Sequence, residues 1–364
     1  MIYLIITIVI LTALYFIITA REVFGAEPKG ERLKRMQQSG HYKDGQFQNL
    51  SHTPSLTEGY SMPGVIYNFF FAKKDPLLKP LKNIPSIHTD LAALSKDEDV
   101  FIWLGHSSYY IRTDGVSFLI DPVLSGYGSP FKYFNKAFAG ADIFKPADIP
   151  HLDYLVITHD HYDHLDYPTV KAIKDKVAKV ILPLGVGAHL ERWGYKEDQL
   201  IEEEWGGSRE LKNHIRITFT PARHFSGRKV KRNVTLWTSY VLETPTKKIF
   251  LGGDSGYDTH FKIIGDTYGP FDYAIIENGQ YNDAWKYIHA LPEDVIKASI
   301  DVNARNIIPV HSSKFALALH AWDEPLKRVT SLGKEKNLTI LTPMIGEVMD
   351  LNTSDHHFRA WWED

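Results

Sequence analysis

The chain has 364 residues, enough for one large domain or two ordinary ones, and its 44% hydrophobic content is sufficient for a substantial core. The formal net charge of −3 lacks the strongly basic character of nucleic-acid-binding proteins, so we expect no nucleic-acid partner. The absence of cysteine excludes disulfide bonds and thiolate metal ligands, and it leaves the redox compartment undecided.

The chain begins with an uncharged apolar stretch over residues 2–20, IYLIITIVILTALYFIITA. Its length matches the roughly 17–25 residues of a membrane-spanning helix, so residues 1–20 are predicted to form a single transmembrane anchor. A cleaved signal peptide is the alternative, but no Lys or Arg precedes the stretch, which exceeds the roughly 7–15 residues of a signal-peptide core.

Basic residues follow this stretch and none precedes it: Arg21, Lys29, Arg32, Lys34 and Arg35. The positive-inside rule therefore predicts a membrane protein with its catalytic domain in the cytoplasm. The signal-peptide alternative would instead place that domain outside the cytoplasm.

Residues 21–95 mix Gly, Pro and charged residues with short apolar pieces and show no clear periodicity. We expect a lead-in segment wrapped on a catalytic domain that spans residues 96–364. From Val100, VFIWLG and YYIRTDGVSFLIDP read as strands, the second with a hairpin turn at Thr113, Asp114 and Gly115.

Strands and helices then alternate along the chain. LDYLVITHD and KVILPLG read as buried strands on either side of a helix in PTVKAIKDKV. Further strands are predicted in IRITFTPA, TLWTSYVLET, KKIFLGGDSG and NIIPVH, with a helix in PEDVIKASIDVN. This order predicts an α/β fold, and two similar halves are plausible.

Candidate metal ligands stand where predicted strands end. His159 follows VIT, His224 follows TPAR, Asp254 follows IFLGG and His311 follows NIIPV. Strand ends of a rigid sheet present side chains to one cleft, so residues far apart in the sequence can converge there.

The hexapeptide HDHYDH adds His161, Asp163 and His164 to His159. Seven ligands are too many for one tetrahedral ion and fit two. Imidazole and carboxylate suit two divalent ions in an open catalytic site, with zinc expected and manganese or iron compatible. The alternative is a surface turn that caps the helix beginning near Pro168.

HDHYDH has the HxHxDH pattern of the metallo-β-lactamase superfamily, and the three later residues match its remaining ligand positions in order and context. The resemblance implies a four-layer αββα sandwich with a dinuclear site at one edge. It assigns His159, His161 and His224 to one ion, Asp163, His164 and His311 to the other, and Asp254 to the bridge between them.

Longer blocks resemble the N-acylphosphatidylethanolamine-hydrolysing phospholipase D family: WLGHSSYYI, LIDPVLS, ITHDHYDHLDY, TPARHFSGR, LGGDSGY, GPFDYAIIENGQY and IPVHSSKFAL. They lie between about residue 100 and residue 325. The resemblance implies a phosphodiesterase that hydrolyses phospholipids, with Asp163, Asp254 and His289 as catalytic residues. ENGQYNDAWKYIHALPED matches only in part, so a lactone or ester hydrolase of the same fold stays as the alternative.

Four further residues receive expected roles. Asp121 is predicted to orient a ligand histidine, with an ordinary turn residue as the alternative. His106 is predicted to lie behind the site, with a purely structural residue as the alternative. Arg223 and Arg228 flank His224 and are predicted to clamp a phosphate, although Arg228 also fits a solvated loop charge. A non-catalytic scaffold is disfavoured because all seven ligands are present, and the oligomeric state is left open.

Overall fold

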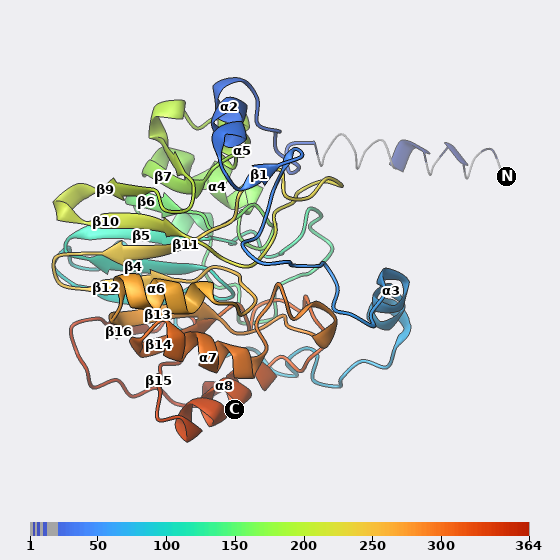
Figure 1. The fold of residues 1–364 in the computed structure, drawn as a ribbon. Coiled ribbons are helices and arrows are strands. Elements are labelled where there is room, and N and C mark those ends of the chain that lie inside the picture. The colour runs from blue at the N-terminus through green and yellow to red at the C-terminus, as the bar shows by residue number, and fades with distance from the viewer. Residues whose placement is uncertain (1–2, 4–5, 8–9, 13–20, 364) are drawn as a thin grey trace.

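Two seven-stranded sheets form the centre of the computed structural model, which describes residues 3, 6–7, 10–12 and 21–363 (Figure 1). The first sheet has the order β16-β3-β4-β5-β6-β7-β8. Its strands are β3 (Val100–Trp103), β4 (Tyr109–Thr113), β5 (Val116–Ile120), β6 (Leu152–Val156), β7 (Val177–Pro183), β8 (Leu200–Glu203) and β16 (Val348–Asp350).

The second sheet has the order β15-β14-β13-β12-β11-β10-β9. Its strands are β9 (Ser208–Glu210), β10 (Arg216–Thr220), β11 (Ser239–Glu243), β12 (Lys248–Leu251), β13 (Phe271–Glu277), β14 (Ala304–Val310) and β15 (Thr339–Ile340). A separate small hairpin pairs β1 (Tyr42–Lys43) with β2 (Gln46–Phe47).

Helices lie outside the two sheets; most of them cover the outer faces, whereas α3 stands away from the sheets (Figure 1). They are α2 (Gly30–Gln38), α3 (Met62–Phe71), α4 (Tyr167–Ile173), α5 (Gly187–Arg192), α6 (His260–Tyr268), α7 (Pro292–Asp301) and α8 (Glu324–Glu335). On β12, Ile249 and Leu251 join the core cluster between the sheets, whereas Phe250 packs with Phe261 of α6 in a second cluster. This alternation gives the second sheet two buried faces, as the layered α/β architecture requires.

Strand direction gathers the candidate ligands at one edge of each sheet. In the first sheet β5 and β6 are parallel, and β3 shares their direction because two antiparallel pairings separate it from β5. In the second sheet β12, β13 and β14 are parallel, and β10 shares their direction for the same reason. The carboxyl ends of all these strands therefore open into neighbouring loops.

The predicted hairpin between β4 and β5 is present, with Thr113 opposite Val116 and a two-residue turn between them. Asp114 and Gly115 both have positive φ, 48° and 75°, as a type I′ turn requires. The predicted helix in PTVKAIKDKV is shorter than expected, because α4 ends at Ile173 and β7 begins at Val177.

The lead-in segment 21–95 contacts the rest of the chain through buried charge and apolar packing. Arg32 of α2 donates to Glu202 at 2.7 Å and to Glu191 at 2.8 Å. Met36 and Phe47 are fully buried in a cluster with Trp205 and other residues of the second half. These contacts attach α2 and the β1–β2 hairpin to the two-sheet body.

The prediction of a single-pass membrane anchor over residues 1–20 is wrong for the residues that the structure describes. Residues 1–2, 4–5, 8–9 and 13–20 lie outside the described residues, and no helix in the described part of the chain is long and apolar enough to cross a bilayer. The prediction rested on hydropathy alone, which is necessary for a spanning helix but not sufficient. The cytoplasmic orientation inferred from the flanking basic residues loses its basis as well.

Candidate metal centre

The loop that follows β6 carries two of three converging imidazoles. His159 Nε2 lies 2.9 Å from His161 Nδ1, and the same Nδ1 lies 3.2 Å from Nε2 of His224, which follows β10. His159 and His224 are buried and His161 is half-buried. This burial argues against the alternative of a surface turn, and three nitrogens at such distances suit one metal ion.

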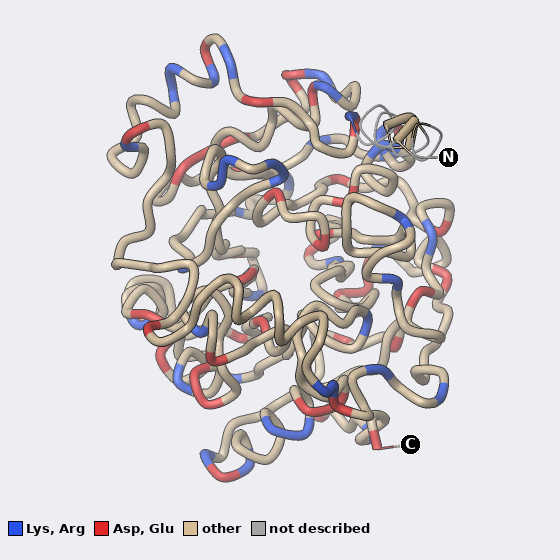
Figure 2. Tube along the Cα trace, turned by 90° about the vertical axis from the view of Figure 1, so that its right-hand side faces the viewer, with Lys and Arg blue, Asp and Glu red and all other residues tan. Residues whose placement is uncertain are grey.

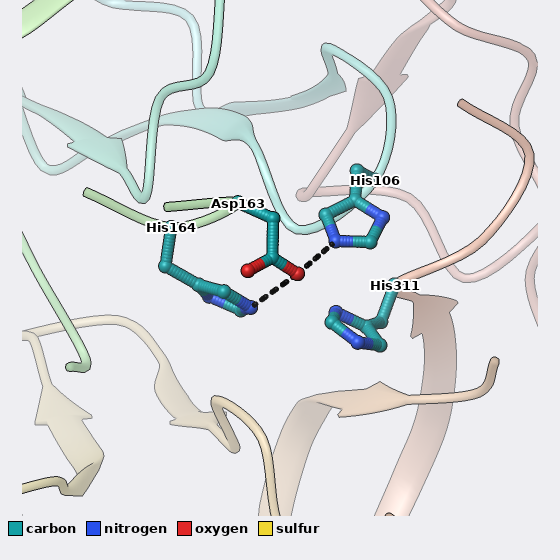
Figure 3. A group of neighbouring side chains, drawn as sticks. All are labelled: His106, Asp163, His164 and His311. Carbon is teal, nitrogen blue, oxygen red and sulfur yellow. Dashed lines mark hydrogen bonds and ion pairs between the residues drawn. The ribbon is translucent and has the colours of Figure 1, made fainter. Parts of the chain in front are cut away.

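A second set lies beside the first and is drawn in Figure 3. It joins Asp163 and His164 from the loop after β6 to His311 from the end of β14. Asp163 Oδ2 lies 3.8 Å from His164 Nε2 and accepts a hydrogen bond from His106 Nε2 at 3.0 Å. His106 therefore holds the Asp163 carboxylate in place.

Asp254, at the end of β12, lies between the two sets. Its Oδ2 is 3.1 Å from His164 Nε2 and 3.8 Å from His224 Nε2, and its Oδ1 is 3.1 Å from His311 Nδ1. One carboxylate thus approaches a member of each set, which is the placement expected of a bridging ligand.

Four ligand imidazoles have Nδ1 held by a partner. The pairs are Thr158 Oγ1 with His159 Nδ1 at 2.9 Å, Asp121 Oδ2 with His164 Nδ1 at 2.7 Å, the Ile288 carbonyl with His224 Nδ1 at 2.8 Å, and Ser107 Oγ with His311 Nδ1 at 2.8 Å. In His159, His164 and His224 these contacts fix the ring orientation and leave Nε2 directed at the centre. His311 differs, because its Nδ1 also lies 3.1 Å from Asp254 Oδ1.

Buried polar atoms without a hydrogen-bond partner accumulate at this centre. Nε2 of His164, Nε2 of His311 and Oδ1 of Asp254 have no such partner in the described part of the chain. Native proteins rarely leave several such atoms together, because each one costs free energy unless a ligand satisfies it. The residues therefore fit two divalent ions held by imidazole and carboxylate.

Burial keeps three of the imidazoles in ligand form. It lowers the pKa of His159, His224 and His311 well below the ordinary value, so their lone pairs are free at neutral pH. His164 differs, because the Asp254 and Asp121 carboxylates outweigh burial and raise its pKa well above the ordinary value. Burial alone would raise the pKa of Asp254, but His164 outweighs it and holds that pKa well below its usual range.

Asp121 has a more extensive role than a turn residue. It is buried, has a φ of 41°, and accepts from the Thr158 amide at 2.8 Å and the Thr158 hydroxyl at 2.6 Å besides its contact with His164. Through these bonds it fixes both His164 and the residue that orients His159.

His289 lies over the centre and pairs with a residue that the sequence analysis missed. Its Nδ1 is 2.8 Å from Glu277 Oε2, while Glu277 Oε1 accepts from the Ala290 amide at 2.7 Å. Burial raises the pKa of Glu277, and the Glu277 carboxylate outweighs burial to raise the pKa of His289. Glu277 ends β13, so the strand-end pattern that singled out the metal ligands could have found it.

Arg223 and Arg228 do not point at the centre. All three guanidinium nitrogens of Arg223 donate to Thr53, Tyr257 and His52, and those of Arg228 donate to the carbonyls of Val23, Asp160 and Leu165. Arg228 is also buried, which excludes a solvated charge. Both residues fasten the lead-in to the site loops, so the geometry does not favour the predicted phosphate clamp.

A pocket of about 210 Å³ opens onto Asp163, His289 and His311. The remainder of its lining is mostly apolar: Ser55, Leu56, Met62, Val65, Phe225, Arg232, Gln280, Trp285, Ile288 and Leu317. Leu56, Met62 and Val65 come from the lead-in, so that segment forms one wall of the pocket.

Residues 117–312 match the model of the beta-lactamase superfamily domain. The chain belongs to this superfamily. Its two sheets with outer helices agree with the metallo-β-lactamase fold of metal-dependent hydrolases, as predicted. The match spans all seven candidate ligands, from His159 to His311.

Individual proteins are also similar to this chain over most of its length. An uncharacterized protein of Mycobacterium tuberculosis is 35% identical over 90% of this chain and 88% of its own length. The N-acyl-phosphatidylethanolamine-hydrolyzing phospholipase D 1 of Caenorhabditis elegans is 31% identical over 68% of this chain and 74% of its own length. The metallo hydrolase Igni18 of Ignicoccus hospitalis, at 22% identity and a TM-score of 0.51, covers 70% of this chain and 98% of its own, and shares the fold.

Proposed function

We propose that this protein is a dinuclear metal-dependent phosphodiesterase of phospholipase D type that hydrolyses N-acylphosphatidylethanolamine-like lipids. The observation that carries the proposal is the pair of buried ligand sets joined by Asp254 beneath an apolar pocket. The similarity to the Caenorhabditis elegans phospholipase D supports the choice of substrate class.

The ligands divide between two ions in this proposal. His159, His161 and His224 would hold one ion, Asp163, His164 and His311 would hold the other, and Asp254 would serve as a ligand to both. Zinc fits the donors best, and manganese or iron would also be accepted. When bound, such a pair of ions supplies a hydroxide nucleophile near neutral pH and neutralises charge on the phosphoryl oxygens.

Residues of the chain position the substrate and deliver a proton to the leaving group. The lining of Leu56, Met62, Val65 and Phe225 receives acyl chains, which lose contact with water there. Because His289 Nδ1 is hydrogen-bonded to Glu277, Nε2 is the ring nitrogen that can face the substrate in the pocket. A proton on Nε2 passes to the ethanolamine oxygen as its bond to phosphorus breaks, and water supplies the oxygen that phosphorus gains. The products are an N-acylethanolamine and phosphatidic acid.

The domain organisation is part of the same proposal. Residues 96–364 form the catalytic domain, and residues 21–95 wrap on it and complete the pocket wall. Asn49 of the lead-in supports this, since it accepts from the His224 amide at 3.1 Å and donates to the His224 carbonyl at 2.8 Å.

The test uses the full chain, loaded with zinc, on a chromogenic phosphodiester and on a lactone. His224→Ala serves as the inactive blank, and His214→Ala, whose side chain is 91% exposed, serves as the matched control. Turnover of the phosphodiester alone supports the proposal and leads to assays on N-acylphosphatidylethanolamine in detergent micelles. Turnover of the lactone alone would assign the protein to the lactone and ester hydrolases of this fold.

A further inference from the structure

Helix α3 is apolar along its whole length, yet none of its residues is buried. Its sequence is MPGVIYNFFF, and Tyr67, Phe70 and Phe71 are 61%, 67% and 73% exposed. Figure 1 shows α3 standing away from the two sheets on the right-hand side of the molecule. Soluble proteins rarely expose contiguous apolar surface of this kind without a partner for it.

Two other segments share this character. In the segment 129–136, SPFKYFNK, Tyr133 and Phe134 are 65% and 63% exposed. In the segment 228–232, RKVKR, the Val230 side chain is fully exposed. Both segments thus expose an apolar side chain next to lysine.

The three segments surround the mouth of the metal centre. Met62 and Val65 of α3 line the pocket over Asp163 together with Arg232. Pro130 and Lys229 line an adjoining pocket of about 370 Å³ that shares Asp163 and Arg232 with the first. We call residues 62–74, 129–136 and 228–232 together the rim surface.

The rim surface is basic although the whole chain is slightly acidic. It has no Asp or Glu, whereas the full chain has a formal charge of −3. Its exposed basic residues are Lys73, Lys74, Lys132, Lys136, Lys229, Lys231 and Arg232. Of these, Lys229 forms a 3.4 Å ion pair with Glu27. Figure 2 views the side of the molecule on which α3 lies and colours Lys and Arg blue.

We propose that the rim surface docks on an anionic lipid bilayer. Aromatic side chains favour the headgroup region, and lysine side chains are attracted to an anionic surface. A ten-residue helix spans only about 15 Å, half the hydrocarbon thickness, so α3 lies in the plane of the interface. A protein partner is disfavoured because protein interfaces are depleted in lysine.

Docking of the rim surface would also give lipid a route to the metal centre, an inference that rests on the proposed function. The inner end of α3 lines the pocket while Tyr67, Phe70 and Phe71 face outward. A phospholipid that leaves the bilayer at the rim surface would then reach the metal centre along an apolar wall, without crossing water.

The absence of cysteine allows a local test in the full chain. Phe70→Cys, Tyr133→Cys and Val230→Cys each receive an environment-sensitive fluorophore, and Ile263→Cys on α6, 58% exposed at wild type, is the matched control. Phosphatidylcholine vesicles are added with or without phosphatidylglycerol. We expect the three rim probes to brighten at least about twofold with phosphatidylglycerol, to be quenched by brominated acyl chains, and to lose the signal in high salt.

Each probe reports its own position, whatever other part of the chain touches the vesicle. Rim probes that respond no more than the Ile263 probe would overturn the proposal. So would a response that depends on protein concentration without vesicles, because it would make the rim surface an interface between copies of this chain.

A second pair of variants separates docking from chemistry. Phe70→Ser with Phe71→Ser should lower vesicle binding at least about tenfold and leave turnover of a soluble phosphodiester unchanged, whereas Ile263→Ser with Ile300→Ser should change neither. Equal vesicle binding by both double variants would contradict the proposal. Rim probes that respond in a protein without phosphodiesterase activity would refute the proposed function alone.

Discussion

The two sheets repeat one pattern of strand pairing, but they deliver the candidate ligands in different ways. In each sheet three antiparallel pairings are followed by three parallel ones. The first sheet supplies four ligands from the single loop after β6, whereas the second supplies His224, Asp254 and His311 from three separate loops. A ligand cluster can therefore be built from several donors in one loop or from single donors at the ends of strands that run in the same direction. We expect substitutions in the two kinds of loop to affect metal binding differently.

Asp254→Ala should produce the largest effect, because this carboxylate lies close to members of both ligand sets. We expect loss of at least one ion and a fall in hydrolysis of at least about 1,000-fold. Metal content by mass spectrometry and turnover of the phosphodiester measure both. Asp266→Ala, an exposed carboxylate on α6, is the control, and full metal content with normal turnover in Asp254→Ala would refute the bridging assignment.

Substituting one histidine from each sheet tests whether the two sheets contribute ligands to the same ion. His161→Ala from the dense loop and His224→Ala from the dispersed set remove nitrogens that lie 3.2 Å apart. If they serve one ion, each should weaken zinc binding by a similar factor of about 100 or more, measured by competition with a chromogenic chelator. Factors that differ strongly would show that the two residues do not serve the same ion.

Residues behind the ligands should have an intermediate effect in both halves. Asp121→Asn keeps a residue type that tolerates positive φ but weakens the hold on His164, and Ser107→Ala frees His311. We expect each to lower zinc affinity about tenfold with little change in the melting temperature of the metal-free protein. A variant that lowers that melting temperature and leaves zinc affinity intact would have a purely structural role.

Glu277→Gln tests the positioning of His289 without touching a predicted ligand. The variant keeps the size of the side chain but removes the charge that faces His289 Nδ1 at 2.8 Å. We expect kcat to fall about tenfold, with KM and metal content unchanged. Loss of metal instead would make Glu277 part of the metal centre, since Glu277, His289, Asp254 and His311 form one close group.

Asn49→Ala should have the smallest effect of the series. It removes two hydrogen bonds from the lead-in to the main chain of His224, at 2.8 and 3.1 Å, while the ligand ring keeps its contact with Ile288. A loss of about 1 kcal/mol corresponds to a fall in zinc affinity of about fivefold. An unchanged zinc affinity would show that the lead-in attaches to the domain without contributing to the metal centre.

Sequence reasoning succeeded where several residues of one function stand close together or follow a strong strand. HDHYDH was recognisable because four donors lie within six positions, and Asp254 and His311 because each ends an apolar run. It failed for Glu277, since a single glutamate after a strand has many roles, and for Arg223 and Arg228, since nothing in a sequence says which way a guanidinium points. The predicted anchor failed because hydropathy is necessary for a spanning helix but does not by itself show that one forms.

The amino-acid sequence by itself determined the superfamily, the seven candidate ligands and the order of strands and helices, because these depend on local residue types and their spacing. Tertiary structure decided which donors meet, because only the common direction of β5, β6, β10, β12 and β14 brings their carboxyl ends to one edge. It also decided that Arg228 is buried against main-chain carbonyls and that α3 keeps its aromatic side chains exposed. Burial and side-chain direction are properties of the packed chain, and no short stretch of sequence contains them.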